Sequence, residues 1–173
     1  ELFYYRTSGD GRFEQVRQVW LRGLLALRRP GAGFRRSVAS DLESPYYNGE
    51  TWLALALYAL TFEAPTVHAV LADVDNYMMA KYGGAPEIGF FHWGLMAAEL
   101  RWRATGEARF ALFVREQVGH YLQEMRPKLN PNANTCYALE GLYPALAMTT
   151  DDPVLNQSLR FRVRAEMRKN LGF

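Results

Sequence analysis

Apolar residues recur at helical spacing along most of the chain. In residues 12–28 they fall three or four positions apart and form one stripe, which is typical of an amphipathic helix with one buried face. The same spacing predicts further helices over residues 50–62, 65–81, 91–105, 107–125, 134–148 and 153–170. No segment alternates apolar and polar residues as a half-buried strand does. The pattern therefore predicts an all-α fold of about seven helices without a sheet.

Short turns recur at intervals of 44 residues between these helices. The segments 61–64, 105–108 and 149–152 each follow a strongly apolar helix and precede an amphipathic one. This is a repeat of helical hairpins, each with an apolar inner helix and an amphipathic outer helix. Three hairpins are complete, and helix 12–28 is expected to be the outer half of a fourth. Such hairpins stack into an open superhelix or close into an (α/α) toroid, and the contrast between inner and outer helices favours the toroid.

Composition excludes several classes of protein. The single cysteine, Cys136, excludes an internal disulfide framework and a cysteine-based zinc site. The three histidines lack metal-ligand spacing, so we expect no metal site and no cofactor. No apolar run is long enough to cross a membrane, so no membrane insertion is expected. With 20 basic and 18 acidic residues, the charge balance gives no support for nucleic-acid binding.

The net charge of +2 conceals an uneven distribution. Acidic residues concentrate in residues 41–100, whereas arginine and lysine concentrate in the flanks, 1–40 and 101–173. On one interpretation, complementary charged faces meet each other or solvent. On the other, the acidic and aromatic middle of the chain lines a polar cleft.

Three short segments at the starts of the predicted inner helices resemble the motifs of one superfamily. Residues 46–50 (Tyr-Tyr-Asn-Gly-Glu), ahead of a Leu/Ala-rich helix, resemble a Tyr-Pro-Gly-Glu motif. Residues 91–93 (Phe-His-Trp) resemble an Asp-His-Trp motif, and residues 134–142 (Asn-Thr-Cys-Tyr-Ala-Leu-Glu-Gly-Leu) are similar to a Thr-Ala-Ser-Arg-Leu-Glu-Gly-Leu segment. In this order, over residues 11–173, they resemble the bacterial six-hairpin, (α/α)6-toroid glycosidase-like superfamily.

The resemblance implies a role in carbohydrate chemistry, because such toroids include glycoside hydrolases, polysaccharide lyases and sugar epimerases. It also implies that residues 1–173, although they form a single all-α domain, are about half of a larger ring. The rest of the ring would come from the same chain or from another subunit. A secreted or periplasmic location is the one that the resemblance favours.

Three residues at the starts of the inner helices are candidates for catalysis. Glu50 and Glu140 are the acid/base candidates, and His92 would assist them. Each has a structural alternative. Glu50 would also be favourable in the first turn of a helix, Glu140 would pair with an arginine, and His92 would be a satisfied core histidine.

Seven further residues are candidates for substrate binding: Tyr46, Tyr47, Trp52, Phe91, Trp93, Asn134 and Tyr137. Aromatic rings present flat faces that suit the apolar C–H faces of a pyranose, although aromatic residues are also ordinary core residues. Asn134 would alternatively cap a helix.

The function predicted from the sequence is therefore a carbohydrate-active protein that acts on or binds an oligo- or polysaccharide in a cleft at the N-terminal ends of the inner helices. The alternative is a non-catalytic helical scaffold or binding module. Two departures favour the alternative: Phe91 stands where the superfamily often has Asp, and Ala138 where it often has Arg.

Overall fold

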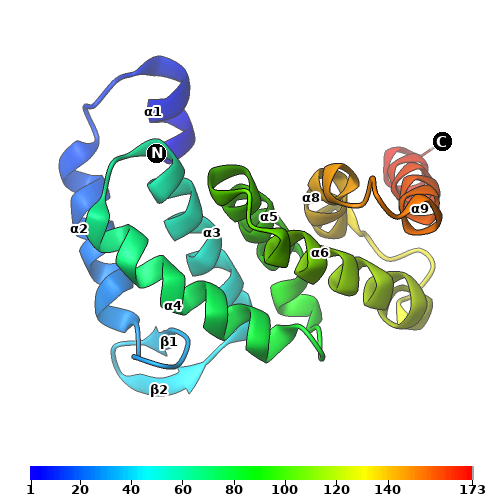
Figure 1. The fold of residues 1–173 in the computed structure, drawn as a ribbon, viewed down its shortest axis with the longest axis horizontal. Coiled ribbons are helices and arrows are strands. Elements are labelled where there is room, and N and C mark those ends of the chain that lie inside the picture. The colour runs from blue at the N-terminus through cyan, green and yellow to red at the C-terminus, as the bar shows by residue number, and fades with distance from the viewer. Residues whose placement is uncertain (173) are drawn as a thin grey trace.

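A computed structural model describes residues 1–172, and helices account for most of them (Figure 1). The principal helices are α1 (Leu2–Ser8), α2 (Glu14–Leu27), α3 (Pro45–Thr61), α4 (Pro65–Tyr82), α5 (Ile88–Thr105), α6 (Ala108–His120), α8 (Cys136–Ala145) and α9 (Pro153–Leu171). Short turns of π-helix (η1, Tyr121–Met125), α-helix (α7, Arg126–Lys128) and 3₁₀-helix (η2, Leu146–Met148) extend α6 and α8. The all-α prediction is confirmed.

The helices pair as hairpins whose inner members lie side by side. Helix α5 packs against α3 on one side and against α8 on the other. Helices α4, α6 and α9 each pack on the inner helix of their own hairpin, α3, α5 and α8. The core lies between these two layers and consists mainly of aromatic and branched aliphatic side chains, among them Trp52, Leu71, Phe90, Phe110 and Leu142.

Glycines let the three inner helices approach closely. A Cβ atom on Gly49 of α3 would lie 2.7 Å from the Cβ of Trp93 on α5. A Cβ atom on Gly141 of α8 would lie 2.9 Å from the Cα of His92. Both distances are shorter than carbon atoms tolerate, so each of these helix contacts requires a glycine.

The inner helices begin at residues that differ from those predicted. Helix α3 begins at Pro45, five residues before the predicted start at residue 50, and α5 begins at Ile88. Proline suits the first turn of a helix, because its missing N–H is one that the helix would leave unpaired. Tyr46 and Tyr47 therefore lie on the first turn of α3, and not in a loop before it.

The absence of a sheet is the part of the fold prediction that is wrong. Strands β1 (Arg35–Ser37) and β2 (Ser40–Glu43) form an antiparallel hairpin between α2 and α3. Its strands are short and largely polar, so they carry none of the alternation by which a strand is detected. The buried ring of Phe34 anchors the hairpin, and Asn48 accepts a hydrogen bond from the Phe34 amide at 2.8 Å.

Helix α1 was not predicted, because its seven residues are too few to establish a helical period. A helix able to cross a membrane is not found among the described residues.

Candidate functional site

Five ring side chains form a continuous row across the N-terminal ends of the three inner helices. Tyr47 and Tyr46 of α3 lie 5.8 Å apart between ring centroids, and Tyr46 lies 5.6 Å from Trp93 of α5. Trp93 lies 4.4 Å from His92, which lies 5.6 Å from Tyr137 of α8. We call these five residues the aromatic row. The structure thus brings together five of the ten residues that the sequence singled out.

The row presents both exposed faces and buried polar atoms. Tyr46 and Tyr47 are 44% and 43% exposed, and Trp93 and Tyr137 are half-buried. The Nδ1 atom of His92 and the Nε1 atom of Trp93 are buried, and no described residue hydrogen-bonds either of them. Buried polar atoms normally have a partner, so this pair of adjacent unpartnered nitrogens is the most unusual polar feature of the row.

Burial also sets the protonation state of His92. Desolvation lowers the pKa of its imidazole below the ordinary value, because the charged ring would lose its hydration. His92 is therefore neutral near pH 7 and can accept or donate a hydrogen bond at a ring nitrogen.

The two glutamates predicted to act together lie on opposite sides of α5. Glu140 is exposed on α8, next to Gly141, which contacts the His92 backbone. Glu50 is exposed on α3 and lines a cavity shared with α1 and α2. Packed helices are about 8–10 Å apart between axes, so α3 and α8 are separated by roughly 16–20 Å across α5. Paired carboxylates of glycosidases are at most about 9.5 Å apart. Each glutamate thus follows or precedes a glycine that contacts α5: Gly141, after Glu140, meets the backbone of His92, and Gly49, before Glu50, meets Trp93.

Neither glutamate has an ion-pair partner among residues 1–172. The structural alternative for Glu140, an ion pair with an arginine, is therefore not observed among the described residues. Asn134 is exposed, and its side-chain oxygen accepts a hydrogen bond from the Cys136 amide at 2.9 Å, which forms an Asx turn just before α8. The N-cap residue of α8 is Thr135, so Asn134 does not cap the helix.

Two aromatic residues predicted to bind substrate are core residues instead, and for them the prediction is wrong. Trp52 is fully buried, and its Nε1 atom donates a hydrogen bond to Asp75 at 2.8 Å. Phe91 is also fully buried and stacks on Tyr121 with ring centroids 4.7 Å apart. Both lie on faces of their helices that point between the layers, away from the aromatic row.

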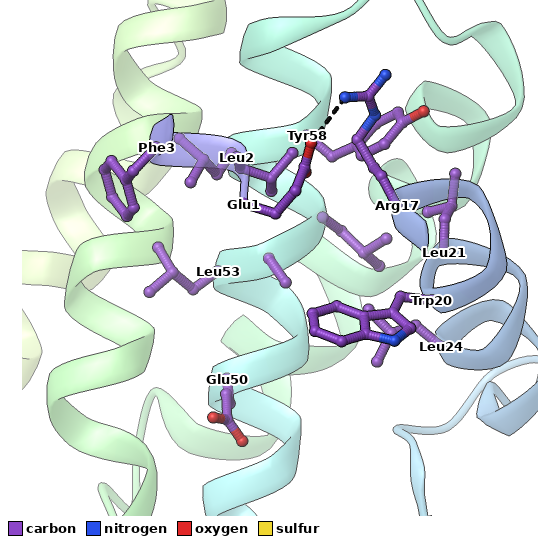
Figure 2. A pocket seen from close by; sticks show the side chains of 13 residues that line it. Glu1, Leu2, Phe3, Arg17, Trp20, Leu21, Leu24, Glu50, Leu53 and Tyr58 are labelled. Carbon is purple, nitrogen blue, oxygen red and sulfur yellow. Dashed lines mark hydrogen bonds and ion pairs between the residues drawn. The ribbon is translucent and has the colours of Figure 1, made fainter. Parts of the chain in front are cut away.

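The cavity beside Glu50 is apolar and has a volume of about 310 Å³ (Figure 2). Its walls come from α1, α2 and α3, and include Leu21, Leu24 and Leu53. At its upper end in Figure 2, Arg17 pairs with Glu1 at 2.9 Å, and Glu50 lies at its lower end. No residue of the aromatic row lines this cavity.

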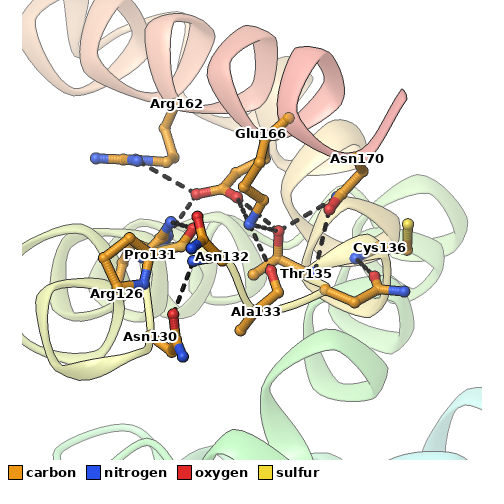
Figure 3. A network of polar contacts seen from close by, with 12 residues as sticks. Arg126, Asn130, Pro131, Asn132, Ala133, Thr135, Cys136, Arg162, Glu166 and Asn170 are labelled. Carbon is orange, nitrogen blue, oxygen red and sulfur yellow. Dashed lines mark hydrogen bonds and ion pairs between the residues drawn. The ribbon is translucent and has the colours of Figure 1, made fainter. Parts of the chain in front are cut away.

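A buried carboxylate that the sequence analysis did not identify orders the loop ahead of α8. Glu166 of α9 is 1% exposed and pairs with Arg126, with Lys169 at 2.7 Å and with Arg162 at 3.2 Å (Figure 3). It also accepts a hydrogen bond from the hydroxyl of Thr135 at 2.6 Å. Burial alone would raise the pKa of Glu166, but the hydrogen bonds from Arg126, Lys169 and Thr135 outweigh it and lower the pKa to about 2. The signal in the sequence was one acidic residue within a run of arginines.

A second carboxylate fixes the approach to α3 in the same way. Glu43 pairs with Arg29 and Lys81 and accepts hydrogen bonds from Tyr77 at 2.7 Å and Asn48 at 3.0 Å. Burial opposes ionisation, but the bonds from Lys81, Tyr77 and Asn48 lower its pKa to about 2. Ionised glutamates thus hold the segments ahead of two inner helices, α3 and α8, whose first turns carry Tyr46, Tyr47 and Tyr137 of the aromatic row.

No protein-family model, curated protein or solved structure matches the chain.

Proposed function

We propose that the protein binds an oligo- or polysaccharide along the aromatic row and acts on it with Glu140 as acid/base, assisted by His92. The observation that carries the proposal is the row itself, which spans three inner helices without interruption. Tyr46 meets Tyr47 and Trp93 edge to face, at interplanar angles of 88° and 87°, so the row is not one flat platform, and each exposed ring would stack on a sugar unit singly. The unpartnered nitrogens of His92 and Trp93 are polar groups that a sugar hydroxyl would satisfy after a small movement of the rings.

The arrangement favours chemistry that uses one carboxylate beside an imidazole. Glu140 is exposed and has no ion-pair partner among the described residues, so its carboxyl group is accessible to a ligand. The backbone of His92 contacts Gly141, the residue after Glu140, and its neutral ring lies 5.6 Å from the ring of Tyr137, one helical turn before Glu140. Such a pair supports proton transfer, as elimination and epimerisation of a sugar require. Hydrolysis by two opposed carboxylates fits less well, because α5 separates Glu50 from Glu140.

Binding is tested by replacing exposed rings of the row. Removing one stacked ring costs about 1 kcal/mol, so Tyr47→Ala should weaken binding of a cognate oligosaccharide about 5-fold in calorimetric titrations. Tyr143→Ala is the matched control, since Tyr143 is 67% exposed on α8 and takes no part in the row. Equal affinities of the Tyr47→Ala, Tyr143→Ala and unmodified proteins would contradict the proposed site.

Catalysis is tested separately, on a panel of neutral and acidic polysaccharides. Glu140→Gln should lower turnover by about 10²- to 10⁴-fold, the usual contribution of a general acid/base, with little change in affinity. Glu50→Gln is the control for loss of a surface charge and should leave turnover within a few fold. Reducing ends formed with an unsaturated product indicate elimination, and reducing ends alone indicate hydrolysis. Loss of turnover in Glu50→Gln but not in Glu140→Gln would refute the assignment.

A second candidate function is a non-catalytic scaffold, and one observation favours it. The apolar residues Val16, Val19 and Trp20 of α2 are exposed, which is typical of a surface that another protein segment covers. A protein that binds a saccharide at the row without converting any member of the panel would support this candidate over the enzyme.

A further inference from the structure

The hairpin α1–α2 repeats α5–α6 in sequence and in local geometry. Residues 8–13 (Ser-Gly-Asp-Gly-Arg-Phe) match residues 105–110 (Thr-Gly-Glu-Ala-Arg-Phe). Helix α1 ends at Gly9 with φ 68° and ψ 5°, and α5 ends at Gly106 with φ 70° and ψ 5°. These left-handed conformations favour glycine, so both helices end with the same type of C-cap.

An ion pair just after each glycine strengthens the correspondence. The Nε atom of Arg12 lies 2.5 Å from a carboxylate oxygen of Asp10, and the Nε atom of Arg109 lies 2.7 Å from one of Glu107. Helix α1 therefore corresponds to the last turns of the inner helix α5, and α2 corresponds to the outer helix α6. Helix α5 has 18 residues, whereas α1 has 7.

Equivalent residues of the two outer helices differ sharply in burial. Phe110 and Phe113 of α6 are 0% and 4% exposed, because α5 and its neighbours cover them. The equivalent Phe13 and Val16 of α2 are 42% and 46% exposed. The apolar stripe of α2 is thus the stripe of an outer helix whose inner helix covers only its end.

The cavity lies where the earlier turns of that inner helix belong. Tyr5 of α1 packs on Phe62 at 4.8 Å between ring centroids, so α1 ends beside the C-terminal end of α3. Glu1 and Leu2 border the cavity, which continues along α3 past Leu57 and Leu53 as far as Glu50 (Figure 2). The cavity is therefore a groove that runs from the first turn of α1 towards Glu50, parallel to α3 and alongside α2. We call it the groove.

We infer that this groove is the seat of an α-helix of the same polypeptide that continues α1 in the N-terminal direction. That helix runs parallel to α3 and presents apolar residues to Leu21, Leu24 and Leu53. It completes a hairpin with α2 as α5 does with α6, and it covers the exposed stripe of α2. A row of four inner helices results, with the groove helix beside α3 and next to Glu50.

The experiment adds ten residues ahead of Glu1 and measures protection of the groove. One extension carries leucines at helical spacing on the face that continues Leu2 and Tyr5. The matched control has the same residues in an order that forms no stripe. The probe is Ala54→Cys in a Cys136→Ser background, since Ala54 lines the groove. Leu112→Cys, on the exposed face of α6, is the reference thiol.

The patterned extension should slow the reaction of the thiol at position 54 with a maleimide at least 10-fold and leave position 112 unchanged. The permuted extension should slow neither, and light scattering should show a monomer throughout. Leu53→Cys serves as a second groove probe if Ala54→Cys does not fold. Equal rates with both extensions would overturn the inference. So would protection that develops in the unextended protein as its concentration rises, because a second copy would then occupy the groove.

Discussion

Replacing Glu166 by Gln removes the charge on which the loop ahead of α8 depends. The pKa of Glu166 is about 2, against an ordinary value of 4.5. At about 1.4 kcal/mol for each pKa unit, the ionised side chain contributes about 3 kcal/mol to the free energy of unfolding at pH 7. Loss of one member of a buried ion pair costs a similar amount, because Arg126 would be left buried without its partner. We therefore expect Glu166→Gln to lose about 3 kcal/mol at pH 7.

The pH dependence separates this effect from a packing defect. Because folding lowers the pKa of Glu166, its contribution is complete above about pH 5 and declines as the pH falls from about 4.5 towards 2. The difference between the unmodified and Glu166→Gln proteins, measured by urea unfolding at pH 7, 5 and 3, should shrink over that range. Glu124→Gln, at an exposed ion pair with Lys128, should cost less than about 1 kcal/mol at each pH. A loss below about 1 kcal/mol for Glu166→Gln at pH 7, or a difference that does not vary with pH, would refute the reasoning.

Three further predictions concern the contacts beneath the aromatic row. Gly141→Ala places a Cβ atom against the Cα of His92 and should lower the free energy of unfolding by about 1–3 kcal/mol in urea titrations, more than an alanine at the open Gly119 of α6. Trp52→Phe removes the hydrogen bond to Asp75 and should lower the same free energy by about 1–3 kcal/mol while leaving saccharide affinity unchanged, since Trp52 is buried away from the row. Because burial lowers the pKa of His92, its ring signals in NMR should titrate below pH 6.5, and the stability that neutral His92 provides should decline as the pH falls below that value.

Periodicity was sufficient to find the long helices but not the features that have little or no period. The stripe of α2 and the apolar helices α3, α5 and α8 were predictable because each is long enough for apolar residues to recur at helical spacing. The β-hairpin was not, because polar strands such as Arg35–Ser37 are held by partners elsewhere in the chain. The sequence also could not predict which aromatic residues of the inner helices are buried. Trp52 and Trp93 both lie near the start of an inner helix. In the structure Trp52 is a core residue bonded to Asp75, whereas Trp93 lies half-buried against Gly49.

The ion pairs of the chain limit the number of carboxylates that are candidates for proton transfer. The acidic middle of the chain mostly neutralises the basic flanks: Asp75 pairs with Arg101, Glu43 with Arg29, and further pairs join Arg28 to Asp73 and Arg35 to Asp41. For these residues the interpretation of complementary charged faces is confirmed. An ion pair satisfies a carboxylate and holds it ionised, so a carboxylate engaged in this way is poorly suited to proton transfer. Glu50 and Glu140 are outside this network in the described residues, although both lie on apolar inner helices. Of the two, only Glu140 lies one helical turn from a residue, Tyr137, whose ring contacts the imidazole of His92. Loss of turnover in Glu140→Gln but not in Glu50→Gln is therefore the result expected of an active site with its acid/base group at this end of the aromatic row.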